Sequence, residues 1–508
     1  MSETLRRLSA CALMLAAFLA PASVFGQTGQ APATGQAATP AAAAARRLSV
    51  NDAVKLALEQ NLSLQVQRID PQLQDLSIAQ VRTAWTPNLS TTITNQSSTS
   101  QPSSFLSGVV DSAVSDRFQA NVAANQLLPW GANYNVAWNS NRFKSNSAFD
   151  SPNPSLAASL SGSYTQPLLR NFKIDSTRQQ LLISKKNREM SDVQLRQTVL
   201  ATVRSVKNAY WDLAYAVANA KVQQQSLDIA RESLRNNKSR VQIGTMAPID
   251  IIEAEAEVAR NEESAIVAEA AITRAEDGLR QLVFDPKTPE FWSMTFDLTD
   301  QPTFQAQTVD VDLAVKNALA QRTDIINMRK NLEATDINIR YYRNQTLPDL
   351  NVQGGYGLTG QGGKEIKFSN DFPPVPLSVI ENGYGSTLSK MFSNDFHNWS
   401  FSVTVGYPIG RSAAEAGLAR ARVARSQTEL QMRSLELQVT TQVREVARTV
   451  NTDRKRVDAT RASRQLAERK LEAEQKKFQA GMSTNFQVIQ AQRDLASARN
   501  AELQAVLD

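Results

Sequence analysis

Two long stretches of this chain lack proline altogether. The first lies between Pro167 and Gly244, which are 77 positions apart, and the second between Pro408 and Gly481, which are 73 positions apart. Because an α-helix rises 1.5 Å per residue, each stretch can form a helix of roughly 110 Å. A soluble globule of 508 residues cannot bury so long a rod. These helices must therefore find partners along their length.

Apolar residues recur at coiled-coil spacing within both stretches. The first carries a 4-3-4-3-4 series and the second a 4-3-4 series, which is typical of a coiled-coil seam. The two series are Val199, Val203, Val206, Tyr210, Leu213 and Val217, and Val439, Val443, Val446 and Val450.

The two stretches end in similar segments. VQIGTMAPIDIIEAEAEVA begins at Val241 and FQAGMSTNFQVIQAQRDLA begins at Phe478, an offset of 237. A glycine ends a helix readily because it adopts positive φ, and in both segments a helical apolar pattern follows it. The sequence therefore predicts two antiparallel helical hairpins, tipped by Gly244 and Gly481.

Other segments repeat in the same order. NDAVKLALEQN at Asn51 resembles DLAVKNALAQR at Asp312, and SYTQPLLR at Ser163 resembles TVGYPIGR at Thr404. Self-similarity on this scale indicates an internal tandem duplication of one structural unit.

Each copy begins with one amphipathic helix and continues with strands. The first helix carries Val54, Leu58, Leu62 and Ile69, and it is expected to end near Pro87, because proline favours extended geometry before it. The run NWSFSVTVGYP alternates apolar residues with small polar ones, and NYNVAWN does the same. Such strands fit either a half-buried sheet or a membrane barrel with a polar lumen, and periodicity alone does not decide. In the first copy, strand-like segments lie at 88–98, 117–127, 132–143 and 156–166, more than two strands need, so the number of strands stays open and an extra hairpin is one alternative.

The N-terminus reads as a targeting segment. A basic pair, Arg6 and Arg7, precedes an apolar run at 8–20 that is too short to span a bilayer. We expect a signal peptide at 1–26. LSAC also resembles a lipobox, but the apolar core follows Cys11 instead of preceding it, so lipid anchoring is not expected. With no run of 18 apolar residues in the mature chain, we expect a periplasmic, secreted or outer-membrane β-barrel protein.

Composition argues against several classes of function. The chain has one Cys and one His, so it cannot assemble a His/Cys metal site by itself. The net charge is +6, and the sequence has no block of Lys and Arg of the kind that binds nucleic acid. A Ser-His-Asp triad would require His397, for which a surface loop is the ordinary interpretation. No nucleophile–base pair or phosphate loop is found, so we expect neither an enzyme nor a cofactor.

Taken together, the signal peptide, the strands, the long helices and the duplicated plan resemble the TolC-like outer-membrane efflux proteins. The resemblance covers about 48–508, and the twin glycine tips carry it most specifically. It implies an α+β membrane protein in the outer membrane: a homotrimeric β-barrel, with about four strands per protomer, continuing into a long periplasmic α-helical coiled-coil barrel. Open strand edges are not tolerated in lipid, so one chain with four strands cannot form the barrel alone.

The resemblance also implies a function and partners. The protein would be the exit duct of a tripartite export system and would conduct small molecules or proteins passively. A periplasmic adaptor protein would bind the tips and link the duct to an inner-membrane transporter. The implied adaptor-docking residues are Val241, Gly244, Thr245, Met246, Phe478, Gly481, Met482 and Ser483.

The narrowest part of the periplasmic entrance is expected just beyond the tips. Family members carry acidic residues where this chain has Gln487 and Gln490, whereas the first copy has Asp250 and Glu253 at the equivalent positions. A ring of amides would not bind cations as carboxylates do. Phe478 and Ser483 cannot supply the family's closing contacts, which need an aromatic hydroxyl and an arginine. We therefore expect other contacts, such as Asp250 with Lys477 or Arg493.

The expected division of the chain follows. From Gly481 only 27 residues remain, against about 40 after Gly244, so we expect the second copy to be truncated at its C-terminus. The segments are a signal peptide at 1–26, a low-complexity linker at 27–47, a first repeat at 48–290, a linker at 291–304 and a second repeat at 305–508. The rival interpretation is a structural or adhesive coiled-coil envelope protein without a channel, which would leave the paired strands unexplained.

Overall fold

The structure is a computed structural model that describes residues 46–101, 112–147, 150–287, 291–300, 309–369 and 375–507. The expected signal peptide, Cys11 and nearly all of the first linker lie outside these residues. Among the residues described, no helix combines the length and the apolar content that crossing a membrane requires.

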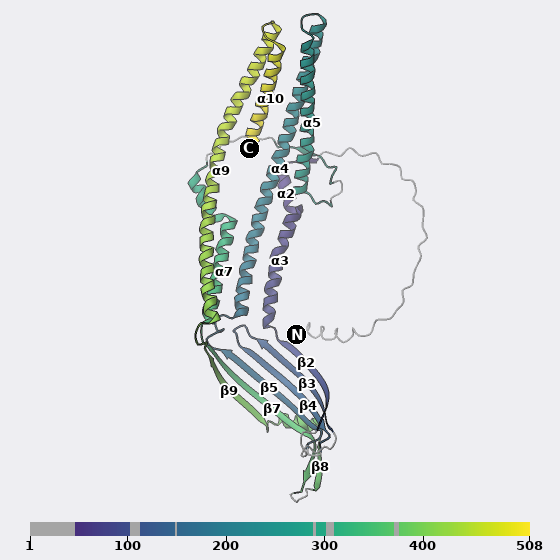
Figure 1. Cartoon of the computed structure of the whole chain (residues 1–508), viewed down its shortest axis with the longest axis vertical. Coiled ribbons are helices and arrows are strands. Elements are labelled where there is room, and N and C mark those ends of the chain that lie inside the picture. The colour runs from purple at the N-terminus through teal and green to yellow at the C-terminus, as the bar shows by residue number, and fades with distance from the viewer. Residues whose placement is uncertain are drawn as a thin grey trace, which may run out of the picture. The chain divides into compact units, whose positions relative to one another are not determined.

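The order of helices occurs twice along the chain (Figure 1). In each case two shorter helices precede the strands, and a long helix with a return helix follows them. The long helices have 67 residues each, or about 100 Å. The first set is α2 (Val50–Gln60), α3 (Leu62–Arg82), α4 (Ser176–Gln242) and α5 (Ile249–Val283); the second is α6 (Val311–Gln321), α7 (Thr323–Gln345), α9 (Ala413–Gln479) and α10 (Asn485–Leu507).

The single helix expected at the start of the first copy is in fact two helices, α2 and α3. Asn61 separates them with extended backbone, and its side chain accepts a hydrogen bond from the amide of Leu64. Asparagine favours this capping role because its side-chain oxygen satisfies a free amide of the first turn. Arg322 takes the same place between α6 and α7.

Burial along the long helices confirms part of the predicted seams. Val206, Tyr210, Leu213 and Val439 are fully buried, whereas Val217, Val446 and Val450 are exposed in the single chain.

A short 3-10 turn, η1 (Thr83–Trp85), joins α3 to the sheet.

The main hydrophobic core lies where α2, α4 and α5 meet a small two-stranded sheet. In this sheet β1 (Arg46–Leu48) pairs in parallel with β6 (Phe296–Leu298). The hydroxyl of Tyr210 donates to the carbonyl of Leu48 and accepts from the amide of Asp300. The buried members are Leu48, Ala53, Ala57, Val206, Tyr210, Leu213, Leu279, Val283, Phe284, Phe291 and Phe296.

Within the described residues the main sheet has seven strands, more than the number of about four per protomer that was expected for the barrel. The four strand-like segments of the first copy all form strands, and each is hydrogen-bonded into the same sheet. The order is β2-β3-β4-β5-β7-β8, and β9 also pairs with β7. The strands are β2 (Asn88–Ser100), β3 (Ala113–Leu127), β4 (Asn133–Ser145), β5 (Ser155–Pro167), β7 (Asp349–Phe368), β8 (Pro376–Asn382) and β9 (His397–Gly406).

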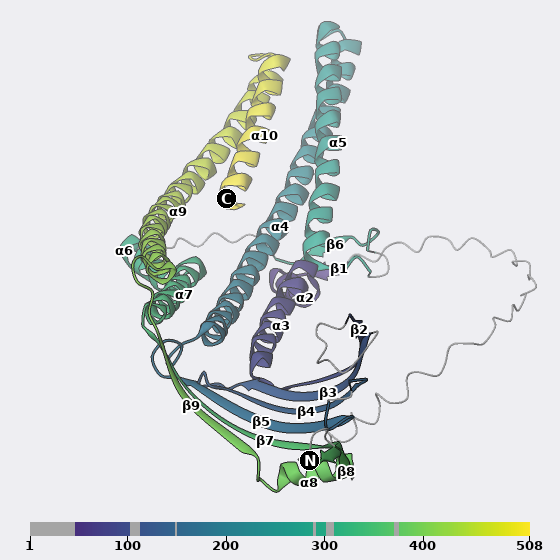
Figure 2. The ribbon, with the colours of Figure 1, turned by 60° about the horizontal axis from the view of Figure 1, so that its bottom comes forward.

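The register gives the sheet one apolar and one polar face. One row of paired residues runs Thr92, Asn121, Asn139, Ser159 and Thr359, and another row, on the opposite face, includes Trp138, Leu160 and Leu358. The apolar row continues the alternation predicted for NYNVAWN and NWSFSVTVGYP. Figure 2 shows the sheet bent into a trough, with β2 and β9 along its two sides.

The elements at the far end of the sheet were not predicted. Helix α8 (Tyr384–Phe392) follows β8 and packs against β5 and β7, with Thr387 and Met391 buried. A surface loop was expected for His397, but this residue is the first of β9. Its Nδ1 lies 2.9 Å from the carbonyl oxygen of Asn394.

Candidate functional site

The tip of the first hairpin is a helix end closed by backbone hydrogen bonds. The amide of Thr245 donates to the carbonyl of Arg240 (2.9 Å), and that of Gly244 donates to the carbonyl of Val241 (3.0 Å). Gly244 has φ +74°, which a residue with a Cβ adopts at a cost. This pair of bonds is the Schellman motif, which satisfies carbonyls that would otherwise be unpaired at the helix end.

The second tip has the same geometry. Met482 donates to the carbonyl of Lys477 (2.8 Å), Gly481 donates to that of Phe478 (3.2 Å), and Gly481 has φ +76°. The sequence similarity of the two tips therefore reflects one shared backbone turn, and both glycines are required by conformation.

The predicted docking residues lie on these two turns, but they differ in exposure. Thr245 and Met482 are exposed, and Met482 has a relative accessibility of 74%. Phe478 is partly buried, because it packs on the core between α9 and α10. Ser483 is also partly buried, and its hydroxyl donates to Glu474 (2.8 Å).

Two contacts join the hairpins close to their tips. Asn237 of α4 and Asn485 of α10 are both buried, and the amide of Asn237 donates to the side-chain oxygen of Asn485 (3.0 Å). The guanidinium of Arg240 lies 4.7 Å from the centre of the Phe478 ring, a cation–π distance. The second tip is therefore held against the first within one chain.

A third contact between the hairpins is an ion pair. Arg493 of α10 donates to both carboxylate oxygens of Glu257 on α5, with a shortest distance of 2.5 Å. The side chain of Glu257 is only 7% exposed and that of Arg493 is 39% exposed. Asn261 and Arg260 also bind the Glu257 carboxylate.

The pKa of Glu257 reflects two opposing effects. Burial raises the pKa of this carboxyl, because it disfavours the charged form. The hydrogen bonds and the charge of Arg493, helped by Asn261 and Arg260, outweigh burial and hold the pKa below its ordinary value. Glu257 is therefore ionised at neutral pH and is a stable partner for Arg493.

These contacts correct the expected pairing of Asp250. Arg493 binds Glu257, and Lys477 binds Glu474 (2.7 Å), so both of the cations proposed for Asp250 have other partners. The two carboxylates differ in their place on α5. Glu257, two turns further along the helix than Asp250, is the one that Arg493 reaches. Asp250 lies in the first turn, where the helix dipole favours a carboxylate without a cation beside it.

The other predicted entrance residues lie near the starts of α5 and α10. Glu253 and Gln487 are exposed. Gln490 is partly buried and donates to Asp494 (3.0 Å), which in turn pairs with Lys470 of α9. Gln490 therefore supports the second hairpin.

Sequence reasoning missed the residues that join the hairpins. Asn237 and Asn485 are 248 positions apart, and Glu257 and Arg493 are 236 apart, so no local pattern links them. One signal was available. Ala254, Glu257 and Asn261 follow 3-4 spacing, so polar side chains occupy positions where a seam ordinarily carries apolar ones.

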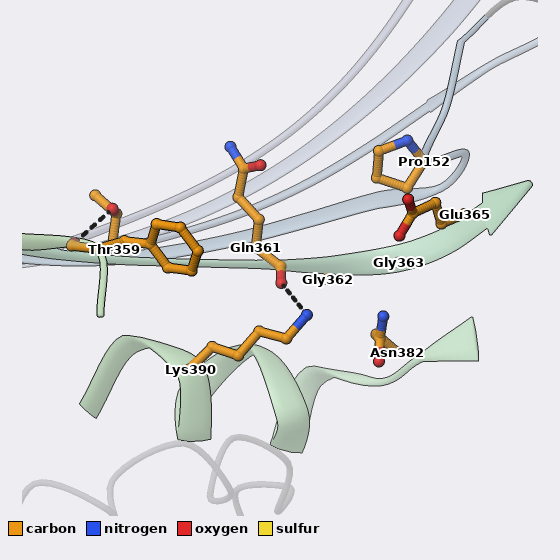
Figure 3. A pocket seen from close by; sticks show the side chains of 9 residues that line it. Pro152, Thr359, Gln361, Gly362, Gly363, Glu365, Asn382 and Lys390 are labelled. Carbon is orange, nitrogen blue, oxygen red and sulfur yellow. Dashed lines mark hydrogen bonds between the residues drawn. The ribbon is translucent and has the colours of Figure 1, made fainter. Parts of the chain in front are cut away.

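A separate pocket lies at the far end of the sheet, between β7, β8 and α8 (Figure 3). Lys390 reaches toward the carbonyl of Gln361 (3.4 Å), while Glu365 and Asn382 lie at the other end of the pocket. Within the described ranges, no group of three or more His, Cys, Asp or Glu is placed to hold a metal ion.

Comparisons with known proteins agree with this architecture. The family described as outer membrane efflux protein matches residues 134–283 and 314–508. No curated protein sequence matches the chain.

Several solved structures are similar in fold. A membrane protein from Pseudomonas aeruginosa has a TM-score of 0.62 at 17% identity, covering 94% of this chain and 96% of that one. The Campylobacter jejuni CmeC outer membrane channel has a TM-score of 0.62 at 14% identity, covering 90% and 82%. The outer membrane protein VceC from Vibrio cholerae has a TM-score of 0.61 at 16% identity, covering 90% and 92%. At these identities the likeness concerns the fold.

Proposed function

Since the chain belongs to the outer membrane efflux protein family, we propose that it is the exit duct of a tripartite export system, through which small molecules or proteins pass from a periplasmic adaptor and an inner-membrane pump to the exterior. The resemblance inferred from the sequence is confirmed by this membership. The protein resides in the outer membrane and has a large periplasmic portion. The duct itself catalyses no reaction and needs no cofactor, because the pump supplies the energy.

One observation carries the proposal: the two-faced sheet continues directly into long helices. The apolar face, with Trp138, Leu160 and Trp399, suits lipid, and the opposite face is lined mainly by Ser, Thr, Asn and Gln, with Arg117 and Glu365 among its few charged residues. A polar lumen behind an apolar outer surface is the pattern of a membrane barrel. Helices of about 100 Å then extend the passage into the periplasm. A rigid envelope rod would need the helices but not this sheet.

The glycine tips are the proposed docking site for the adaptor. They combine fixed backbone turns with exposed apolar side chains, Ile243 and Met482, both 74% accessible. Aliphatic and methionine side chains on a bare turn suit an apolar partner surface. The docking surface would comprise Val241, Gly244, Thr245 and Met246 from the first tip and Phe478, Gly481, Met482 and Ser483 from the second.

The entrance is proposed to be held closed by the contacts between the hairpins. Asn237–Asn485, Arg240–Phe478 and Glu257–Arg493 all join α10 or its tip to the first hairpin, so an outward movement of the second hairpin must break them. Gln487 and Gln490 would line the narrowest ring, with Asp250 and Glu253 nearby. Strong block of conductance by trivalent cations at the periplasmic mouth would contradict the ring of amides.

A genetic experiment tests the export function. Deletion of the gene should raise sensitivity to at least one toxic compound or reduce secretion of a protein, and the wild-type gene should restore the phenotype. The double variant Ile243→Asp, Met482→Asp should fail to restore it while reaching the outer membrane, because charge disfavours an apolar contact. Glu263→Asp, on an exposed part of α5, is the matched control and should restore it. Unchanged sensitivity and secretion in the deletion strain would contradict export.

A further inference from the structure

The sheet supplies six strand positions, side by side, to any barrel that the chain helps to form. Strand β7 has two edges, and β5 occupies one of them over Asn351–Gly363. At Gly363, β7 pairs with Ser155 of β5 and also with Asn382 of β8, so β8 lies on the other edge. Strand β9 shares that edge along Asp349–Leu358. The positions are therefore β2, β3, β4, β5, β7 and a last one that β8 and β9 share.

The hairpin of β3 and β4 is an integral part of this sheet. Each pairing, β2 with β3 and β3 with β4, extends over thirteen residue pairs. The turn between β3 and β4 packs on the loop that leads into α4. At Gly131, φ is +92° and a Cβ would lie 2.7 Å from the guanidinium of Arg178. That guanidinium donates to the carbonyls of Asn171 and Phe172, so it fixes the loop as well.

The two outer strands of the sheet are unpaired on one side in the single chain. All residues of β2 and of β9 are exposed, whereas β3, β4 and β5 between them are partly covered. Every neighbouring pair in the sheet is antiparallel, and there are six positions. Strands β2 and β9 therefore run in opposite directions, so β9 of one copy can continue the antiparallel order onto β2 of the next. Unpaired edges are not tolerated in lipid, which requires such pairing.

The helices above these two edges carry unpartnered apolar stripes. Helix α3 leads into β2, and its stripe has 4-3-4-3 spacing; α9 follows β9, and its stripe has a spacing of seven. Within the chain the order of contacts is α3–α4–α7–α9, so the stripes lie on the two outer helices. Heptad spacing on both suits a coiled-coil contact between antiparallel helices. The exposed residues are Leu62, Val66, Ile69, Leu73 and Leu76 on α3, and Val423, Leu430 and Leu437 on α9.

We infer that each chain supplies six strand positions to the barrel, so that the homotrimer implied by the family resemblance closes eighteen strands above a ring of twelve helices. The contact joins β9 and α9 of one copy to β2 and α3 of the next, and two different faces of this kind generate a closed ring. The inference rests on the proposed function, and the number of copies, three, is the one that the family resemblance implies. The family resemblance implies twelve strands, four from each copy. This chain has two further strands, β3 and β4, which form a hairpin between β2 and β5 and have no helices of their own. At equal tilt, eighteen strands make a barrel about 1.5-fold wider than twelve.

Electron cryo-microscopy of the full-length protein in lipid nanodiscs tests the strand number. The expected result is a threefold map with eighteen strands and with β3 and β4 in the barrel wall. A threefold map with twelve strands, and with this hairpin folded away from the wall, would overturn the inference and leave the export function intact. A particle without a lumen would overturn both.

Disulfide cross-linking tests the contact between copies independently of strand number. In a Cys11→Ser background, Ile69→Cys on α3 and Leu430→Cys on α9 should yield covalent dimers and trimers on oxidation. Each single variant is the control and should remain monomeric in denaturing gels. Absence of cross-linked species with the pair, and with Leu62→Cys and Leu437→Cys as a second pair, would contradict the contact.

Discussion

At the scale of single residues, the structure depends on a few polar side chains placed where apolar ones are usual. Glu257 is nearly inaccessible to solvent, and it is tolerated because Arg493, Asn261 and Arg260 satisfy its carboxylate. Burying a charge without partners costs several kcal/mol, so each partner has a structural effect. The pair joins the two hairpins, so under the proposed closure its strength would set how readily the entrance opens.

The first prediction concerns this pair. Glu257→Gln and Arg493→Gln should each lower the free energy of local opening of α10 by about 2 kcal/mol, and the double variant should cost less than their sum. Hydrogen exchange at the amides of α10 measures this free energy. The exposed pair Lys238–Glu255, at 2.8 Å, is the matched control, and its coupling should be below about 0.5 kcal/mol. Additive effects for Glu257 and Arg493 would show that the pair is not coupled.

The second prediction concerns pH. The pKa of Glu257 is lower in the folded protein than in the unfolded chain, so the unfolded state binds a proton first as pH falls. The stability from this group is complete above the ordinary glutamate pKa of about 4.3 and is lost as pH falls through the lower folded value. The difference between wild type and Glu257→Gln should therefore persist at pH 6 and shrink below about pH 4. The same exchange measurement across this range checks the effect, and a difference that vanishes near pH 6 would contradict it.

At the scale of elements, the sequence predicts what local signals determine and misses what distant pairs determine. The glycine tips, the long helices and the strands of the first copy follow from spacing, proline content and glycine conformation. The apolar spacing continues from α2 into α3, so the pattern predicted one helix and gave no sign of the break at Asn61. Helix α8 has nine residues, too few to show a period, and β8 has seven. The contacts of Asn237 with Asn485 depend on the packing of α10 against α4, which no single segment encodes.

The third prediction concerns the tips. Gly244→Ala and Gly481→Ala should destabilise the last turns of α4 and α9 by about 1 kcal/mol, because alanine at positive φ is strained. Amides of those turns should then exchange about fivefold faster. Gly278→Ala is the control with the opposite sign: Gly278 lies inside α5, and a Cβ there meets open space. Alanine is the better helix former, so exchange around it should slow. Slower exchange at the tips as well would show that positive φ is not required there.

At the scale of the whole molecule, two surfaces of the single chain remain incomplete. The outer strands β2 and β9 are exposed throughout, and the outer helices α3 and α9 carry apolar stripes on the same two sides. In the proposed trimer, copies of the chain would complete both at once, and the closed ring would form a passage with a largely polar lining. The width of that passage in the membrane depends on strand number, whereas its periplasmic end depends on the contacts between the hairpins.

The most direct test of the exit duct is the single-channel conductance of the purified protein in planar lipid bilayers. The account predicts discrete, uniform conductance steps for the wild type, and more frequent or longer openings for Glu257→Gln at the same pH and salt concentration. Bilayers that contain the inserted protein, verified by recovery of the oligomer, but that show no steps at any applied voltage with either variant would contradict it.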